Sequence, residues 1–114
     1  MRPTRPVSWI TPARKAFEAF PQGAREVFLD ALTVAAEGGM AAVAKPMKGL
    51  GSGVFEIAVP YRGNAFRVVY AVQLGDELWV IHAFQKKSTQ GIKTPRYEIE
   101  LVQDRLKRLK EMLR

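Results

Sequence analysis

The sequence predicts one small α+β domain whose elements follow the order β-α-α-β-β-β-α. The length of 114 residues fits a single domain spanning residues 1–114, and 47% hydrophobic residues allow a modest core. Three stretches have apolar residues at three- and four-residue steps, which is typical of amphipathic helices. Between the second and third of these stretches, three β-prone runs are separated by short turns, which predicts antiparallel neighbouring strands.

The N-terminal third is predicted to hold one strand and two helices. Thr11-Pro12 is a helix-start signal, with the threonine hydroxyl as N-cap and proline at the first helical position. Pro21 ends the first helix, and Gly38-Gly39 ends the second. The short interval around Pro21 predicts that the two helices lie antiparallel. The predicted ranges are 7–10 for the strand, and 13–20 and 22–37 for the helices.

The rest of the chain is predicted to form three strands and a last helix. The predicted ranges are 40–53 for a glycine-rich loop, 54–59, 65–74 and 77–84 for the strands, and 96–113 for the helix. Strand 65–74 is apolar on both faces around Arg67, so we expect it to be central and covered. Thr94-Pro95 repeats the helix-start signal. The apolar seam of the last helix either packs on the sheet or partly meets a partner protein.

The formal charge of +7 lies mainly in the second part of the chain. Residues 45–114 hold thirteen Lys and Arg against seven Asp and Glu, whereas residues 1–44 hold five against four. An anion-binding surface is therefore expected in residues 45–114, although a solubilising surface is the alternative. No stretch has the ~18 apolar residues of a membrane span, and the N-terminus does not resemble a signal peptide. We expect a cytoplasmic protein without a membrane partner.

The inventory of reactive residues excludes several kinds of site. One histidine and no cysteine exclude a His/Cys metal cluster, and nothing around His82 resembles a nucleophile elbow. We therefore expect no metal and no cofactor. The remaining groups suit RNA cleavage by attack of the 2′-hydroxyl on the adjacent phosphate. That reaction needs cations around the phosphate and groups that move protons.

Arg67 is the most informative candidate, because a charge inside an apolar strand needs a partner or an open face. It either binds a phosphate or forms a salt bridge with Glu56 on the neighbouring strand. Lys86-Lys87 is either part of a site at a strand end or a solvated pair. Alternation along the strand places His82 on the same face as Leu78, Val80 and Phe84, where we interpret it as a hydrogen-bonded core histidine.

Several short motifs resemble the RelE/ParE toxin superfamily, and most closely its phage-derived HigB-like subgroup. The resemblance covers about residues 5–113 and implies a RelE-like domain with a curved antiparallel sheet and helices on one side. The motifs are Lys48-Gly49-Leu50, Phe55-Glu56-Ile57, Phe66-Arg67-Val68-Val69-Tyr70, His82-Ala83-Phe84-Gln85-Lys86-Lys87 and Thr94-Pro95. The implied activity is metal-independent cleavage of mRNA on the ribosome, in a hydrolase that a cognate antitoxin neutralises. That antitoxin is expected to be a HigA-like helix-turn-helix protein.

The resemblance also implies roles for individual residues. Arg67, Lys86 and Lys87 would stabilise the phosphate, and Glu56 becomes a candidate base. RelE itself has two lysines where this chain has Glu56 and Ala58, so the lysine mechanism does not transfer. Additional contacts to RNA or phosphate are expected from a looser set of basic and aromatic residues. These are Lys48, Arg62, Lys93, Arg96 and Tyr97.

Two other functions compete with the ribonuclease. A ParE-like inhibitor of DNA gyrase would share the fold and act through protein–protein contact, without needing the basic site. An inactive RNA-binding module is the second alternative, because the strand lysines of RelE are missing. The pair Lys86-Lys87 together with Arg67 favours the nuclease.

Overall fold

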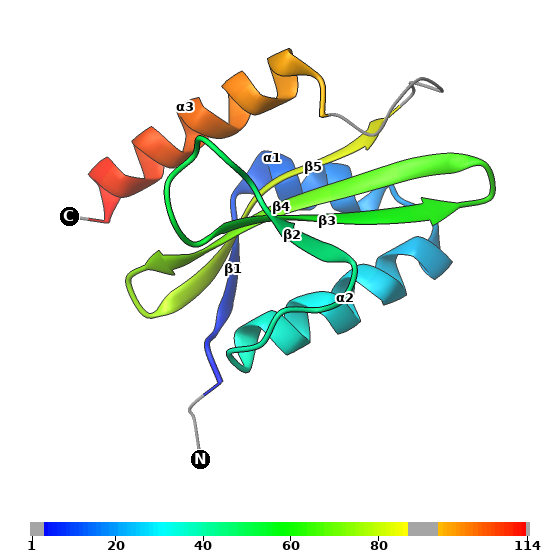
Figure 1. Cartoon of the computed structure of the whole chain (residues 1–114), viewed down its shortest axis with the longest axis horizontal. Coiled ribbons are helices and arrows are strands. Elements are labelled where there is room, and N and C mark those ends of the chain that lie inside the picture. Colours follow the sequence, from blue (N-terminus) through cyan, green and yellow to red (C-terminus); the bar gives the residue numbers. More distant parts are fainter. Residues whose placement is uncertain (1–3, 87–93, 114) are drawn as a thin grey trace.

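A computed structural model describes residues 4–86 and 94–113 of the chain. These residues form a five-stranded sheet in the order β1-β5-β4-β3-β2, together with three helices (Figure 1). The predicted α+β class is confirmed, and one short strand is added to the predicted element order. The elements in chain order are β1 (Val7–Trp9), α1 (Thr11–Glu18), α2 (Gln22–Ala36), β2 (Ala44–Pro46), β3 (Val54–Tyr61), β4 (Asn64–Leu74), β5 (Glu77–Lys86) and α3 (Arg96–Met112).

The sheet is mixed, whereas the sequence predicted an antiparallel one. Strands β2, β3, β4 and β5 are antiparallel to their neighbours, but β1 runs parallel to β5. No tight turn joins β1 to β5, so a hairpin does not set its direction. Strand β4 occupies the central position, as its apolar sequence predicted. Strand β2 lies within the predicted loop 40–53 and pairs with β3 through only three residues.

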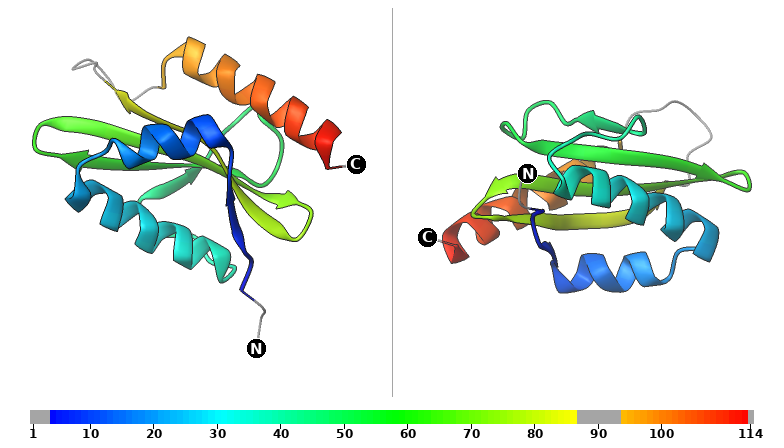
Figure 2. Two further views of the ribbon diagram at one scale, coloured as in Figure 1. Left: turned by 180° about the vertical axis from the view of Figure 1, so that it is seen from behind. Right: turned by 90° about the horizontal axis from the view of Figure 1, so that it is seen from below.

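Helices cover both faces of the sheet, and this corrects the expectation that they lie on one side. Helices α1 and α2 pack on one face, and α3 packs on the other, which we call the α3 face (Figures 1 and 2). Because β4 and β5 are apolar on both faces, each face needs a cover. Val102, Leu106 and Leu109 of α3 are buried against this face, so the apolar seam packs on the sheet as one interpretation proposed.

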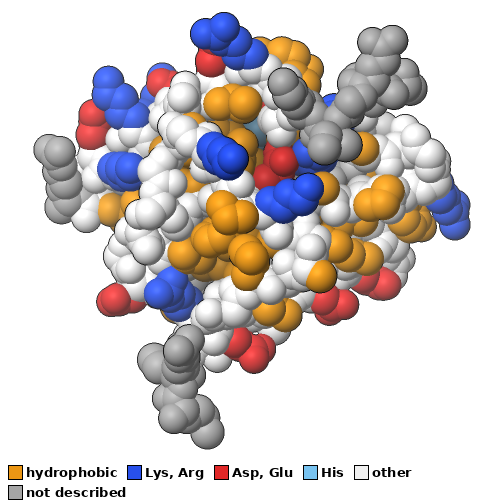
Figure 3. Space-filling view, viewed as in Figure 1, with side chains coloured by type: hydrophobic (Ala, Val, Ile, Leu, Met, Phe, Trp, Pro, Cys, Tyr) orange, Lys and Arg blue, Asp and Glu red, His pale blue; other side chains and the backbone are white. Residues whose placement is uncertain are grey.

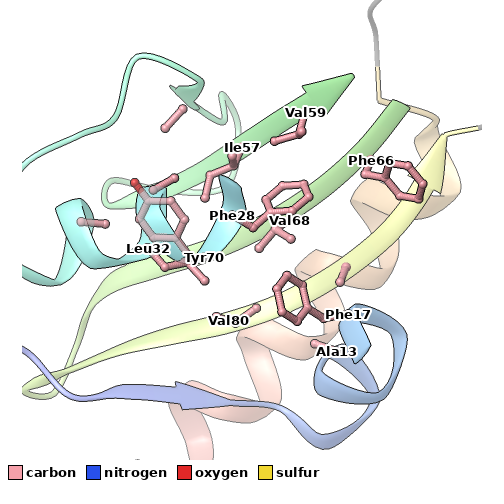
Figure 4. Close-up of a cluster of buried hydrophobic side chains, with 14 of the residues drawn as sticks. Ala13, Phe17, Phe28, Leu32, Ile57, Val59, Phe66, Val68, Tyr70 and Val80 are labelled. Carbon is pink, nitrogen blue, oxygen red and sulfur yellow. The ribbon is translucent and has the colours of Figure 1, made fainter. Parts of the chain in front are cut away.

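The main core lies between the sheet and helices α1 and α2. Figure 4 shows Phe17 and Phe28 pointing from the helices toward Val68 and Val80 on the strands. The ring centroids of Phe17 and Phe28 lie 6.0 Å apart in an edge-on arrangement, which aromatic pairs favour. This core positions β4 and β5, and with them the side chains on the α3 face.

Neither Thr-Pro pair caps its helix, so this part of the prediction is wrong. Helix α1 begins at Thr11 itself, with Ile10 as N-cap residue, and no side chain makes a capping hydrogen bond. Helix α3 has Pro95 as N-cap residue and likewise lacks a side-chain cap. The hydroxyl of Thr94 is engaged elsewhere, as described below. Within residues 4–86 and 94–113, no helix combines the length and apolarity needed to cross a membrane.

Candidate functional site

Glu56, Arg67 and Lys86 come from three neighbouring strands and lie on the α3 face. Residues opposite each other in an antiparallel pair share a face, as do residues two apart along a strand. Arg67 is opposite Phe84, which lies two residues before Lys86. Glu56 is opposite Val69, which lies two residues after Arg67. Both Val69 and Phe84 belong to the apolar cluster beneath α3, so the three charged side chains emerge on one side.

Glu56 and Arg67 form a salt bridge with little exposure to solvent. A terminal guanidinium nitrogen of Arg67 donates to Oε1 of Glu56 over 2.7 Å, and the two side chains are 9% and 14% exposed. The interpretation of Arg67 as the salt-bridge partner of Glu56 is therefore confirmed. The salt bridge also holds the guanidinium at a defined place on this face, which is what a phosphate-binding role would require.

The second oxygen of Glu56 is also engaged. The hydroxyl of Thr94 donates to Oε2 of Glu56 over 2.5 Å, across 38 residues of sequence. Thr94 is half-buried and directly precedes Pro95 at the start of α3. Glu56 therefore connects the centre of the sheet to the beginning of the last helix. The Thr-Pro motif suggested a cap here, and no sequence signal linked Thr94 to Glu56.

The other predicted residues lie on several elements and differ in their exposure to solvent. Lys86 is 5% exposed at the end of β5. Lys48 is exposed in the loop between β2 and β3, and Arg62 is exposed in the β3–β4 turn, with its guanidinium 5.3 Å from the centre of the Tyr61 ring. The remaining members of the set are placed as follows: Arg96 is exposed and paired with Glu100, Tyr97 is 70% exposed, and Lys87 and Lys93 lie outside the described residues.

Lys45 is a cation at this site that the sequence analysis missed. The register places Lys45 of β2 directly opposite Glu56 of β3, so both side chains lie on the α3 face. Lys45 is exposed. Figure 3 shows acidic side chains near the centre of this face with Lys and Arg side chains beside them. The sequence did not predict strand β2, and only the pairing of β2 with β3 determines the face on which Lys45 lies.

A β-bulge turns His82 toward α3, which corrects the predicted alternation. The register pairs Val69 with His82 and Tyr70 with Val80, so Ile81 is an extra residue on β5. Val80 therefore faces the main core, while Ile81 packs beneath α3. His82 stacks on Phe84, with 4.9 Å between the ring centroids. The expected grouping of His82 with Phe84 is confirmed, and its grouping with Leu78 and Val80 is wrong because the bulge shifts the alternation by one residue.

His82 is a hydrogen-bonded core histidine, as interpreted from the sequence. It is 6% exposed, its Nε2 lies 3.0 Å from a carboxylate oxygen of Glu98, and its Nδ1 lies 3.1 Å from a guanidinium nitrogen of Arg105. Because a guanidinium has only donors, Nδ1 accepts and the ring proton lies on Nε2, which donates to Glu98. The same Arg105 nitrogen also donates to the carbonyl oxygen of Ile81. This network ties the middle of α3 to the bulge.

The histidine in this network is neutral. Burial lowers the pKa of His82, and the positive charge of Arg105 adds to that effect, whereas Glu98 opposes it through its hydrogen bond and its charge. Desolvation is the largest of these causes. Arg105 on Nδ1 supports the same direction, because a protonated ring would place two donors against each other. The neutral His82 ring therefore joins β5 to Glu98 and Arg105 of α3 through hydrogen bonds.

A groove of about 900 Å³ lies away from these cations. It runs between residues 4–6, the end of α2 and the far side of the sheet, where Phe55 and Tyr70 stack 5.3 Å apart. Burial raises the pKa of Tyr70 to about 12, so its phenol keeps its proton at neutral pH. The groove is therefore separate from the charged cluster on the α3 face.

The charged cluster on the α3 face consists of Glu56, Arg67, Lys86 and Lys45. It offers one carboxylate, a guanidinium and lysine ammonium groups. Such a set can hold an anion and accept a proton without a redox centre. Among the described residues, no group of three or more His, Cys, Asp or Glu side chains is placed to hold a metal ion. The arrangement suits a phosphate ester better than an uncharged substrate.

Comparisons with known proteins agree with this architecture. The model of the family "Phage derived protein Gp49-like (DUF891)" matches residues 15–107. The structure is similar to that of a mutant of the E. coli toxin RelE in the free state, with a TM-score of 0.64 and 17% identity over 93% of this chain and 98% of that one. No curated protein matches the sequence. The chain therefore belongs to the phage-derived Gp49-like family and has a fold like that of the E. coli toxin RelE.

Proposed function

We propose that this protein is the toxin of a toxin–antitoxin system and that it cleaves mRNA on the ribosome without a metal. The observation that supports this most is the placement of Glu56, Arg67 and Lys86, from three neighbouring strands, on one face of the sheet. The exposed Lys45 lies on the β2 side of the same face and adds positive charge there, and Lys48 is exposed in the loop that follows β2. The family and the fold support the toxin part of the proposal.

The proposed reaction is transesterification at phosphorus. The ribose 2′-oxygen bonds to the adjacent phosphorus, the bond from phosphorus to the 5′-oxygen breaks, and the products are a 2′,3′-cyclic phosphate and a 5′-hydroxyl. Glu56 takes the proton of the 2′-hydroxyl. Arg67 and Lys86 stabilise the additional negative charge on the phosphoryl oxygens. Lys86 and Lys87 are the candidate donors of the proton that the leaving 5′-oxygen takes up.

The proposal includes two macromolecular partners. The substrate is mRNA held in the ribosome, which presents a single-stranded backbone that exposed cations and the aromatic ring of Tyr97 can contact. A cognate antitoxin, proposed to be a HigA-like helix-turn-helix protein, keeps the toxin inactive by binding its folded form. Such binding would raise the apparent stability of this small domain.

Induced expression followed by primer extension on cellular mRNA tests the proposal. The wild-type chain is expected to produce discrete, codon-linked cuts, and Lys86→Ala and Arg67→Lys are expected to lose most of them. Arg14→Ala is the matched control, because Arg14 lies on α1, on the opposite side of the sheet from the α3 face, and forms an exposed pair with Glu18. Arg67→Lys is preferred to Arg67→Ala, because loss of the charged partner of the largely buried Glu56 would destabilise the fold by roughly 3–5 kcal/mol.

Two results would contradict the ribonuclease. Arrested growth with intact mRNA and trapped gyrase would indicate a ParE-like inhibitor. Binding of RNA that weakens with salt, without cuts under any condition, would indicate an inactive RNA-binding module.

A further inference from the structure

Thr94 makes a contact that helix formation does not explain. Its place before Pro95 at the start of α3 is typical of a capping residue, yet no side chain caps this helix. The hydroxyl instead donates to Oε2 of Glu56 over 2.5 Å. Since Arg67 donates to Oε1, each oxygen of this carboxylate already has a protein donor. A substrate hydroxyl that takes the acceptor position now used by Thr94 or Arg67 must therefore displace that donor.

The two donors differ in how easily a substrate can displace them. Arg67 is 7% exposed and lies on the central strand, and it is bound to Glu56 by charge as well as by a hydrogen bond. Thr94 is half-buried, lies outside any regular element and contributes an uncharged hydroxyl. Thr94 is therefore the donor that a substrate hydroxyl would displace more easily, and Oε2 is the oxygen that it would then bind.

The chemistry of the displaced group matches that of the incoming group. The threonine side chain is a secondary alcohol, and so is the ribose 2′-hydroxyl, which also acts as both donor and acceptor. We propose that the Thr94 hydroxyl occupies, in the free protein, the position on Oε2 of Glu56 that a ribose 2′-hydroxyl takes when RNA binds. The inference rests on the proposed function. It makes Thr94 a positioning residue that keeps Glu56 engaged until a 2′-hydroxyl replaces it.

The inference predicts how affinity depends on a single hydroxyl. In the wild-type chain, one hydroxyl replaces another on Oε2, so a ligand with a 2′-hydroxyl should bind about as well as its 2′-deoxy analogue. In Thr94→Ala the 2′-hydroxyl meets an oxygen without a protein hydroxyl donor, so it should improve affinity roughly tenfold, within the range of a hydrogen bond to a charged group. Thr94→Ser keeps the hydroxyl and should behave like the wild type.

The experiment uses the full chain and two short oligonucleotides that are 2′-deoxy at every internal residue and end in a 3′-phosphate. One carries the terminal 2′-hydroxyl and the other lacks it, and neither has a 5′-leaving group that could be cut. Fluorescence anisotropy gives the two dissociation constants for the wild type, Thr94→Ala and Thr94→Ser. The ratio compared is the dissociation constant of the 2′-deoxy ligand divided by that of the ligand with the 2′-hydroxyl. Thr11→Ala is the matched control, since Thr11 also precedes a proline at a helix start and α1 lies on the opposite face of the sheet.

The outcomes separate this inference from the proposed function. A ratio that rises in Thr94→Ala and stays near the wild-type value in Thr94→Ser and Thr11→Ala supports the inference. A ratio that is unchanged in Thr94→Ala overturns it, and the proposed ribonuclease then stands if the wild type still cuts mRNA. A wild-type chain that binds neither oligonucleotide and cuts no mRNA overturns both.

Discussion

Arg67 and Glu56 show how one pair of side chains meets a structural and a chemical requirement together. A guanidinium on the central strand needs a counter-charge, and the carboxylate 2.7 Å away provides it. The salt bridge also holds the two groups in a fixed relative position, which the proposed contacts with a phosphate and a 2′-hydroxyl would need. The two interpretations of Arg67 from the sequence are therefore compatible in this fold. The salt bridge is observed, and the phosphate contact is the proposal.

His82 leads to a prediction about stability and pH. Its folded-state pKa is lowered, mainly by burial, so folding favours the neutral ring. The unfolded chain takes up this proton near pH 6.5. The contribution of His82 to the free energy of unfolding is therefore complete above about pH 6.5, and it is lost as the pH falls from there toward the folded-state pKa. Urea unfolding at pH 7.5 and pH 5.5 measures the loss.

A His82→Gln variant is the control for this pH effect, because glutamine can still donate to Glu98 and does not titrate. The chain has one histidine, so no other side chain has its ordinary pKa in this window. We expect the difference in stability between the two pH values to be smaller in the variant. An equal difference in both proteins would contradict a neutral His82 in the folded state.

At the scale of elements, turns and bulges determine which way the functional side chains point. The β3–β4 hairpin turns at Arg62 and Gly63, both with positive φ, of 50° and 80°. Two-residue turns with this geometry match the twist of the strands and favour Asn-Gly. Their tightness holds β3 and β4 in the register that brings Glu56 beside Arg67. The bulge at Ile81 likewise determines the face of the sheet on which His82 of β5 lies.

The hairpin predicts a substitution that stabilises the fold. Arg62 has left-handed backbone geometry without being glycine, which costs roughly 1 kcal/mol. Arg62→Asn should raise the free energy of unfolding by about 0.5 kcal/mol, because asparagine visits this region more readily and favours this turn. Gly63→Ala should lower it. Urea denaturation of the two variants checks both signs, and a destabilised Arg62→Asn would show that the Tyr61 contact outweighs the backbone strain.

At the scale of the whole molecule, different helices cover the two faces of the sheet. One face is closed by α1 and α2 over a continuous apolar core. On the other, charged residues of β2, β3, β4 and β5 share the face that α3 covers, with Lys45 exposed and Arg67 and Lys86 buried. A basic molecule with formal charge +7 thus has cations and a carboxylate together on a single face. Exposed cations on this face are what the proposed contact with a nucleic-acid backbone requires.

Lys45 provides a test of this surface. If RNA lies across the α3 face, Lys45→Ala should weaken binding of single-stranded RNA and reduce the slope of log affinity against log salt by about 0.7. Lys15→Ala is the matched control, because Lys15 is an exposed lysine on α1, which covers the opposite face. Binding measured between 50 and 200 mM salt, a window that spans roughly 10³–10⁵ in affinity for proteins with many phosphate contacts, resolves the slopes. Equal slopes for the two variants would place the RNA elsewhere.

Local sequence signals determined most of the elements of this fold. The alternation and apolar runs of residues 54–84 predicted three neighbouring strands with the most apolar one at the centre, and apolar periodicity predicted all three helices. These signals depend on residues close in sequence, which is why they are readable without a structure. Arg67 stood out for the same reason, as a charge in an apolar strand.

The arrangement of the site was decided by contacts between distant parts of the chain. Strand β2 has three residues and becomes a strand only by pairing with β3, so Lys45 could not be assigned to a face beforehand. The bulge that redirects His82 appears only in the register with β4. Thr94 reaches Glu56 across 38 residues, and its local motif indicated a helix cap. Side-chain direction in a sheet depends on pairing and register, and only tertiary structure sets these.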